Sequence, residues 1–160
     1  MHPEAFAYVE TAARDWTGKK VVEFGSRNVN GSVRPLFSGA EYVGIDSTPG
    51  PDVDVVADAS TWTGKNFDAV VCCEVLEHTP KGADIVLAAA KALKKGGVFI
   101  VTCATTGRAP HSAVDGAAVR PGEFYRNVTQ QTFEKWLAAA KFTSWDITIR
   151  DGDLYCTAVA

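Results

Sequence analysis

Three carboxylates stand at the ends of three short apolar runs in the first part of the chain. Glu23 precedes Gly25, Asp46 closes the next apolar run, and Asp58 closes the one after it. Asp46 lies about 20 residues after Gly25, the spacing of an acid that accepts hydrogen bonds from a ribose diol in dinucleotide-binding folds. The pattern indicates a nucleotide-type cofactor site.

Glu23 is the hardest of the three to explain as a structural residue. An acid directly after two valines and before Phe24 lies at the inner end of a central strand, where a charge is costly without a partner. A cationic ligand would supply that partner. Asp46 and Asp58, each taken alone, could equally be strand-end acids that cap a turn. Their ordered occurrence with Glu23 favours the cofactor site.

A second group of chemically capable residues lies further along the chain. His78 ends the string Glu74-Val75-Leu76-Glu77-His78 at the mouth of a predicted strand, although it could instead pack beside the start of the next helix. Residues 105–128 form a connection of the length that is often a lid or a binding loop, and we expect it to determine substrate specificity. Its charged and aromatic members are His111, Asp115, Arg120, Glu123, Tyr125 and Arg126.

His111 is the best candidate for a general base. A histidine is neutral near pH 7, and this one lies in the expected substrate loop. His78 is the second candidate, and Tyr125 is a third residue that could face the acceptor. The alternative for His111 is a mobile surface residue without a catalytic role.

The elements that must position these residues alternate between short apolar strands and helices. That order predicts a mostly parallel sheet covered by helices. The predicted strands are Lys20–Gly25, Glu41–Asp46, Val53–Asp58, Phe67–Glu74 and Gly97–Ala104.

Helix signals lie before and between these strands. A first helix begins at Pro3 and places Phe6, Val9 and Ala13 at helical spacing. Another lies between residues 79–80 and 94–96, which supply a capping threonine, a first-turn proline and a terminal glycine. Its expected sheet-facing residues are Ile85, Val86, Ala89 and Leu93.

The chain ends in a helix followed by a hairpin. Thr129 is the expected cap of this helix, whose apolar residues recur at helical spacing from Phe133 to Ala140. Residues 144–149 alternate apolar and polar, Asp151-Gly152 supplies a tight turn, and residues 154–159 form the return strand. An ordinary dinucleotide-binding fold does not need this antiparallel ending.

Composition and charge describe an ordinary globular chain. It has 160 residues, 46% of them hydrophobic and 22% charged, with a formal net charge of −3. We expect residues 1–160 to form a single domain that buries about 70% of its unfolded surface. The net charge argues against a broad nucleic-acid-binding face. No signal peptide or membrane span is evident, so a cytoplasmic protein without membrane insertion is expected.

The four cysteines are expected to be structural thiols. Cys72, Cys73, Cys103 and Cys156 all fall in apolar runs, where a thiol behaves as a small hydrophobe. Neighbours in a strand point to opposite faces, so Cys72 and Cys73 cannot both reach one metal ion. There is no Cys-x-x-Cys pair, and no metal site is predicted.

The chain resembles the class I S-adenosylmethionine-dependent methyltransferases, and within them the small methyltransferases similar to ubiquinone-biosynthesis O-methyltransferases. The likeness spans nearly the whole chain. It implies an α/β, Rossmann-like, doubly wound fold whose mostly parallel seven-stranded sheet ends in an antiparallel hairpin strand. It also implies S-adenosyl-L-methionine as the cofactor. The residues that carry it are 21–31, Asp46, 57–59, 67–71, the string 74–78, and 93–100.

The resemblance assigns roles to particular residues. Glu23 meets the methionyl ammonium, Asp46 accepts from the ribose hydroxyls, and Asp58 accepts from the adenine amine. The expected cofactor-binding residues are Glu23, Gly25, Ser26, Gly31, Asp46, Ser47, Asp58, Ala59, Glu74 and His78. The expected catalytic residues are His111, His78 and Tyr125.

The first loop departs from the family's pattern of glycines at alternate positions. Arg27 and Val29 stand where further glycines are expected. Asn28 and Asn30 tolerate positive φ better than most residues, and Gly31 can supply a delayed turn. An altered but functional loop is therefore expected.

A short helix should follow this loop, with Ser32 as its cap and Pro35 in its first turn. Arg27 or Arg34 could contact the carboxylate of the cofactor. The alternative for both is a solvated surface arginine.

The resemblance implies direct in-line methyl transfer to an oxygen or nitrogen nucleophile of a small-molecule or glycan-type acceptor, with nucleic acid not excluded. The oligomeric state is left open by the sequence. One alternative is a non-catalytic cofactor-binding module or partner subunit, which the altered glycine pattern leaves open. A second is an NAD-dependent oxidoreductase, which does not account for Asp58, the string at 74–78 or the terminal hairpin.

Overall fold

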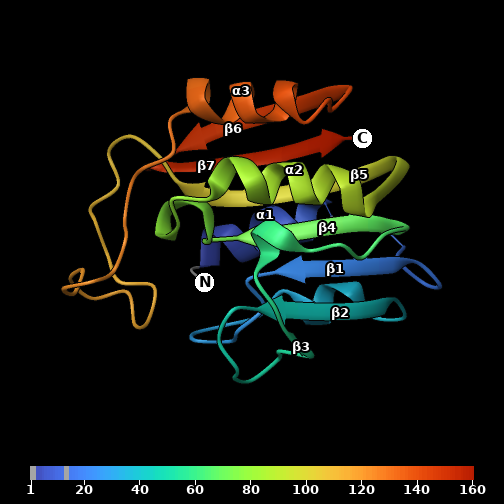
Figure 1. Cartoon of the computed structure of the whole chain (residues 1–160), viewed down its shortest axis with the longest axis horizontal. Coiled ribbons are helices and arrows are strands. Elements are labelled where there is room, and N and C mark those ends of the chain that lie inside the picture. The colour runs from blue at the N-terminus through green and yellow to red at the C-terminus, as the bar shows by residue number, and fades with distance from the viewer. Residues whose placement is uncertain (1–2, 13–14) are drawn as a thin grey trace.

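The computed structural model describes residues 3–12 and 15–160, and within them a seven-stranded sheet has helices on both faces (Figure 1). The strand order is β3-β2-β1-β4-β5-β7-β6. Strands β1 to β5 pair in parallel, and β7 runs antiparallel to both β5 and β6. The fold is therefore the expected Rossmann-like sheet with an antiparallel hairpin strand. The strands are β1 (Lys20–Phe24), β2 (Glu41–Asp46), β3 (Val55–Val56), β4 (Phe67–Cys73), β5 (Leu93–Ala104), β6 (Ser144–Arg150) and β7 (Asp153–Val159).

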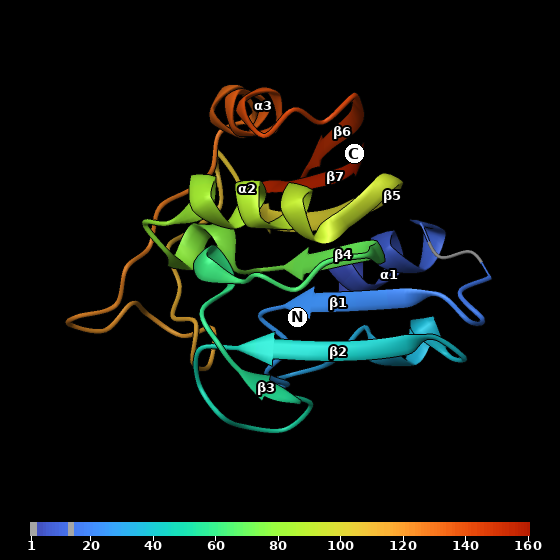
Figure 2. The same cartoon turned by 45° about the vertical axis from the view of Figure 1, so that its right-hand side comes forward.

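Helices α2 (Gly82–Ala92) and α3 (Gln130–Ala139) cover one face of the sheet, and α1 (Pro3–Ala12) lies on the other (Figure 2). Three short 3₁₀ helices connect the strands: η1 (Arg34–Phe37), η2 (Ala59–Thr61) and η3 (Leu76–His78). Successive strands run outward in one direction from β1 and in the other from β4. In open α/β sheets, ligands bind beside such a reversal, at the carboxyl ends of the strands.

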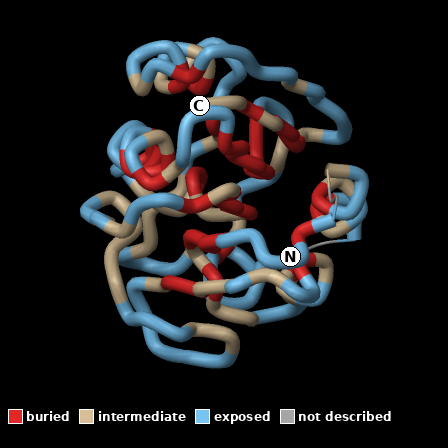
Figure 3. Tube along the Cα trace, turned by 90° about the vertical axis from the view of Figure 1, so that its right-hand side faces the viewer, coloured by how far each residue is buried: buried red, intermediate tan, exposed pale blue. Residues whose placement is uncertain are grey.

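Alternation along the central strands builds one apolar layer on each face of the sheet. Val22 of β1 packs with the α2 and α3 side, whereas Val21 packs with the α1 side. Cys72 and Cys73 divide in the same way, and all four cysteines are buried and free, as expected of structural thiols. Figure 3 shows the buried segments grouped in the interior of the trace, with exposed segments around them.

Several predicted boundaries differ from the structure. The third strand is only two residues long; it lies at the sheet edge, where it pairs with β2 alone, through Val55 and Val56. Helix α2 begins at Gly82 and ends at Ala92, so Leu93 belongs to β5 and not to the sheet-facing side of the helix. A Cβ at Gly82 would lie 2.6 Å from the Trp136 ring, so a close contact with α3 fixes this helix start. Ala13 lies outside the described residues.

The short element after the first loop is the four-residue η1. Its N-cap is Val33 and not Ser32, although the Ser32 hydroxyl accepts a hydrogen bond from the Arg34 N–H at 3.2 Å. At the other end of the chain, Thr129 caps α3 as expected, by accepting from the Thr132 N–H at 3.2 Å.

The terminal hairpin turns at Asp151-Gly152. Both residues have positive φ, 53° and 84°, the conformation that a two-residue turn between twisted strands requires. This turn sets the antiparallel register of β6 and β7, which pairs Ser144 with Val159 and Arg150 with Asp153.

Candidate active site

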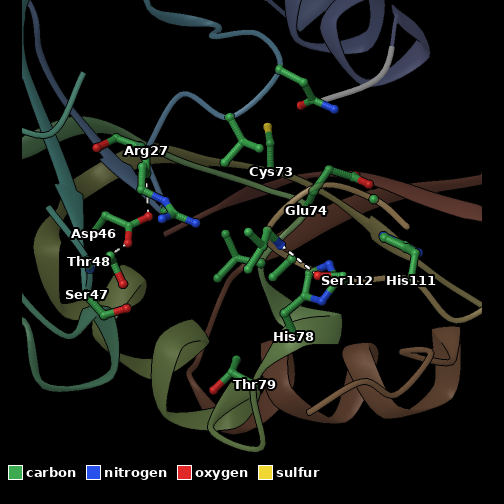
Figure 4. Close-up of a pocket in the computed structure, with 18 of the residues that line it drawn as sticks. Arg27, Asp46, Ser47, Thr48, Cys73, Glu74, His78, Thr79, His111 and Ser112 are labelled. Carbon is green, nitrogen blue, oxygen red and sulfur yellow. Dashed lines mark hydrogen bonds between the residues drawn. The ribbon is translucent and has the colours of Figure 1, made fainter. Parts of the chain in front are cut away.

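A cavity of about 1000 Å³ lies beyond the carboxyl ends of β1, β2 and β4 (Figure 4). Residues 108–114 and 116–118, from the long connection after β5, form part of its wall. All ten expected cofactor residues line it, as do two of the three expected catalytic residues, His78 and His111. Side chains that are far apart in the sequence therefore meet at the point where the strand order reverses.

Glu23 is buried at this end of β1, with 3% of its surface exposed. Its Oε2 accepts a hydrogen bond from the Tyr42 hydroxyl at 2.8 Å. Burial raises the pKa of Glu23 to about 7, against the opposing effect of that hydrogen bond. A carboxyl group in this state gains much from a cationic ligand, because the ligand offsets the desolvation of the charged form.

The turn after β1 depends on a glycine. Gly25 has φ 81°, and a Cβ there would collide with the Val75 side chain. The N–H groups of Gly25 and Ser26 both donate to the Ile45 carbonyl, at 2.8 and 3.0 Å. The turn thus brings the chain back across the end of β2 and leaves the cavity open.

Asn28 holds the atypical part of this loop together. Its side-chain oxygen accepts from the Gly31 N–H at 2.9 Å, and its side-chain nitrogen donates to Asp52 at 2.9 Å. Gly31 has φ 134°, a conformation that favours glycine. The expected delayed turn at Gly31 is present, and a side-chain amide supports the loop that glycines build elsewhere.

Asp46 and Asp58 hold loops and line the cavity at the same time. Asp46 accepts from the backbone N–H groups of Arg27, at 3.3 Å, and Thr48, at 2.8 Å. Asp58 caps η2 by accepting from the Ser60 N–H at 2.9 Å, and its second oxygen accepts from the Lys81 ammonium at 2.7 Å. The hydrogen bond from Lys81 is the main reason that the pKa of Asp58 falls to about 2. Both acids line the cavity while each of their oxygens accepts a hydrogen bond within the protein.

The three expected catalytic side chains form one aromatic cluster. The ring centroids of His78 and His111 are 4.9 Å apart, those of His111 and Tyr125 are 4.9 Å apart, and those of His78 and Tyr125 are 5.4 Å apart. Burial, and secondarily the neighbouring His111, lower the pKa of His78 to about 4. The His78 imidazole is therefore neutral near pH 7.

Hydrogen bonds orient the other two rings of this cluster. Nδ1 of His111 lies 3.1 Å from the Ala109 carbonyl, which can only accept, so the proton is on Nδ1 and the lone pair is on Nε2. The Tyr125 hydroxyl donates to Asn127 at 2.8 Å. Burial raises the pKa of Tyr125 to about 12, so it is a poor base near pH 7.

Glu77 is a member of this site that the sequence reasoning did not assign. It is fully buried, and its Oε1 accepts from the Ala104 N–H at 2.9 Å. Burial, and secondarily the charge of Glu74, raise the pKa of Glu77 to about 8. Its donor atoms and those of His78 and His111 lie within 4.8 Å of one another, a spacing that could hold a metal ion although the sequence predicted no metal site. The sequence feature that could have indicated Glu77 is its position directly before His78, as the second acid of the string 74–78.

Glu74 shapes the wall between the two histidines and the β1 turn. It follows the last residue of β4 with φ 57°, an uncommon conformation for a residue other than glycine. The Thr102 hydroxyl donates to its side chain at 2.8 Å, and its backbone N–H donates to the Thr102 carbonyl at 2.8 Å. The sheet therefore holds this backbone turn at the cavity wall.

The long connection is anchored by its polar side chains. Arg108 pairs with Asp153 of β7 at 3.1 Å, and Asn127 donates to the Arg108 carbonyl at 2.9 Å. Within the connection, the Ser112 hydroxyl donates to Glu123 at 2.7 Å. Arg34, by contrast, lies away from the cavity and pairs with Asp54 at 2.5 Å, so it is not placed to contact a cofactor carboxylate.

Comparison with known proteins identifies the family. Residues 2–147 match the methyltransferase domain family. The chain belongs to this family. The membership confirms the expected class I S-adenosylmethionine-dependent methyltransferase, with S-adenosyl-L-methionine as cofactor, and sets aside the NAD-dependent alternative.

Two curated relatives and one solved structure illustrate the match. A ubiquinone biosynthesis O-methyltransferase of Haemophilus ducreyi is 26% identical over 91% of this chain and 70% of its own length. Another of the same name, from Xanthomonas oryzae pv. oryzae, is 33% identical over 73% of this chain and 56% of its own length. The structure of a Burkholderia thailandensis 1,6-didemethyltoxoflavin-N1-methyltransferase superposes with a TM-score of 0.70 at 18% identity, over 98% of this chain and 76% of that one. This last likeness concerns the fold.

The methyltransferase's cavity fits the chemistry of its cofactor. S-adenosyl-L-methionine carries an ammonium, a ribose diol and an adenine amine, and the cavity presents a buried carboxyl at Glu23 and further carboxylates at Asp46 and Asp58. Among the described residues, no helix combines the length and the apolar composition needed to cross a bilayer.

Proposed function

We propose that this methyltransferase transfers a methyl group to a hydroxyl oxygen of a small-molecule acceptor. The observation that carries the proposal is the ring cluster of His78, His111 and Tyr125, whose two histidines line the same cavity as the strand-end acids. The names of the curated relatives, ubiquinone biosynthesis O-methyltransferases, support oxygen as the acceptor atom.

On the cofactor side, Glu23 holds the ammonium, Asp46 the ribose hydroxyls and Asp58 the adenine amine. When bound, the cofactor supplies an electrophilic methyl group on its sulfonium. Lys81 balances the charge of Asp58 and keeps it ionised, so a ligand amine at this wall meets a carboxylate that can accept a hydrogen bond. Gly25 lets the backbone approach a ligand closely at this wall. A side chain at this position would collide with Val75.

On the acceptor side, Nε2 of His111 takes the proton of the attacking hydroxyl. Its Nδ1 proton is held by the Ala109 carbonyl, which fixes the tautomer that a base requires. The neutral His78 imidazole packs against it and carries no charge that would repel the new imidazolium. Residues 108–118 enclose the acceptor and exclude water, and alignment of the reacting atoms supplies the rest of the rate.

Transfer of a labelled methyl group to defined acceptor pools tests this proposal. Pools of phenols, other small hydroxyl compounds, glycans, amines and nucleic acids are incubated with the protein and labelled S-adenosyl-L-methionine. We expect label in the phenol or other small hydroxyl pools, as a methyl ether. Label confined to amines, glycans or nucleic acids would contradict the proposed acceptor. No transfer to any pool, together with binding of the cofactor, would favour the non-catalytic module.

A further inference from the structure

Among the residues that the structure describes, three cationic side chains other than histidine line the cavity, and they differ in their partners. Lys81 pairs with Asp58 at 2.7 Å, and Arg108 pairs with Asp153 at 3.1 Å. The guanidinium of Arg27 has no hydrogen bond or ion pair with any described residue. Figure 4 shows it extending from the side of Asp46 toward the middle of the cavity. Arg27 is therefore the cation available to an anionic group of a ligand.

The backbone of the same loop offers few donors to such an anionic group. The N–H groups of residues 25 to 28 and of residue 31 already donate within the protein, and the helix that follows is only the four-residue η1. The acceptors are the Ile45 carbonyl for residues 25 and 26, the Asp46 carboxylate for residue 27, the Pro51 carbonyl for residue 28 and the Asn28 side chain for residue 31. A side chain is therefore the stronger partner for an anion at this wall.

The neighbouring loop leaves room for the Arg27 side chain. A Cβ at Gly50 would lie 2.8 Å from Cγ and 2.9 Å from Cδ of Arg27, closer than such atoms approach. The absence of a side chain at Gly50 therefore lets the Arg27 stem lie against this loop. The Gly50 loop thus supports the Arg27 stem, while no described residue pairs with its charged end.

We infer that Arg27 binds the carboxylate of the cofactor's methionyl group, so that Glu23 and Arg27 together bind its ammonium and its carboxylate. The inference rests on the proposed function, because it requires the cofactor to bind with its ammonium at Glu23. A guanidinium presents a planar fork of donors that matches a carboxylate. The residue that breaks the glycine pattern of the first loop thus supplies side-chain donors where the loop backbone offers few.

Two ligands that differ only in the carboxylate test this assignment. S-adenosylhomocysteine carries it, and the decarboxylated analogue S-adenosyl-3-thiopropylamine lacks it. We expect Arg27→Gln to weaken binding of S-adenosylhomocysteine about 10- to 100-fold and to change binding of the analogue by less than about 2-fold, because only the first ligand loses a charge-assisted pair. Calorimetric titration measures both affinities.

Two further variants separate a contact from a change in the loop. Gly50→Ala places a Cβ against the Arg27 stem and should displace that side chain, so we expect it to lower the affinity for S-adenosylhomocysteine. When position 27 is already Gln, adding Gly50→Ala should cause no further loss. Lys81→Gln is the matched control. The Lys81 ammonium pairs with Asp58 on the adenine side, so its loss should change the affinities for both ligands equally.

Each outcome decides the assignment. Equal weakening of both ligands by Arg27→Gln, or no effect on either, would overturn the role of Arg27 and leave the proposed function standing. If the wild-type protein binds neither ligand, the proposed function and this inference are both wrong.

Discussion

The cofactor side and the acceptor side of the cavity are built in different ways. Glu23 is the penultimate residue of β1, Asp46 is the last residue of β2, and Asp58 directly precedes η2, two residues after β3. His111 and Tyr125 belong to residues 105–128, which side-chain pairs such as Arg108 with Asp153 hold in place. The sheet fixes the first group through backbone pairing, whereas single side chains fix the second. Substitutions on the two sides should therefore change different quantities, cofactor affinity on one and turnover or acceptor affinity on the other.

The largest expected effect is on the acceptor side. His111→Ala should lower kcat about 10²- to 10⁴-fold, the range that general bases contribute, and should leave the affinity for S-adenosylhomocysteine unchanged. Steady-state kinetics and calorimetry measure the two quantities. Asp115→Asn is the matched control, since Asp115 is exposed in the same loop and does not line the cavity.

Unchanged turnover in His111→Ala would remove this residue from the mechanism. Repeating the assay with EDTA, and then with added Mg²⁺ or Zn²⁺, shows whether Glu77, His78 and His111 act through a metal ion. If EDTA abolished turnover and added metal restored it, His111 would be a metal ligand and not the general base.

The next effect belongs to the cofactor side. Glu23→Gln should weaken S-adenosylhomocysteine binding about 100-fold at pH 8, because the ammonium loses a buried charged partner. Turnover at saturating cofactor should change far less than in His111→Ala. If both variants lowered kcat and cofactor affinity alike, the two sides of the cavity would not be separable.

The pKa of Glu23 predicts a smaller, pH-dependent effect. Below its pKa of about 7 the carboxyl is protonated and must lose a proton to pair with an ammonium. We expect cofactor affinity to rise about tenfold from pH 6 to pH 8 and then to level off. Glu23→Gln should remove this rise, and a wild-type affinity independent of pH would contradict the ammonium contact.

The same group makes the ligand-free protein less stable as the pH rises. Between the ordinary pKa of 4.5 and about 7, the folded state binds more protons at Glu23 than the unfolded state does. Raising the pH through this window therefore lowers the contribution of Glu23 to the free energy of unfolding, by on the order of 3 kcal/mol at most. Denaturant unfolding of the wild type and Glu23→Gln at pH 5 and pH 8 measures the difference.

The smallest effect tests how the loop is held. Arg108→Gln removes the pair with Asp153 and should raise the acceptor KM by about 3- to 10-fold, with cofactor affinity unchanged, because a looser loop positions the acceptor less well. Arg120→Gln is the matched control, since Arg120 pairs with Asp115 at the exposed surface of the same segment. Equal effects of the two variants would mean that anchoring to β7 has no special role.

The difference between the sheet-borne cofactor side and the loop-borne acceptor side also explains how much of the site the sequence could predict. Glu23, Asp46 and Asp58 were predictable because strands of a parallel sheet end at one edge, so their spacing along the chain determines their place in the fold. The sequence could not predict the start of α2, because this start depends on a contact between Gly82 and Trp136, which are far apart in the sequence.

On the acceptor side, the sequence could name residues and not their arrangement. The residue types of His78, His111 and Tyr125 indicate their chemistry, and only the folded structure shows that their rings lie together. Arg27 and Arg34 were equal candidates until the pair between Arg34 and Asp54 separated them. Such pairings depend on long-range geometry that local patterns do not carry.

Calorimetric titration of the wild-type protein with S-adenosylhomocysteine at pH 8, with NAD as the comparison ligand, tests the central claim most directly. We expect one molecule of S-adenosylhomocysteine to bind per chain, NAD not to bind, and Glu23→Gln to weaken the first. Binding of NAD, or no binding of S-adenosylhomocysteine, would contradict the assignment of this cavity.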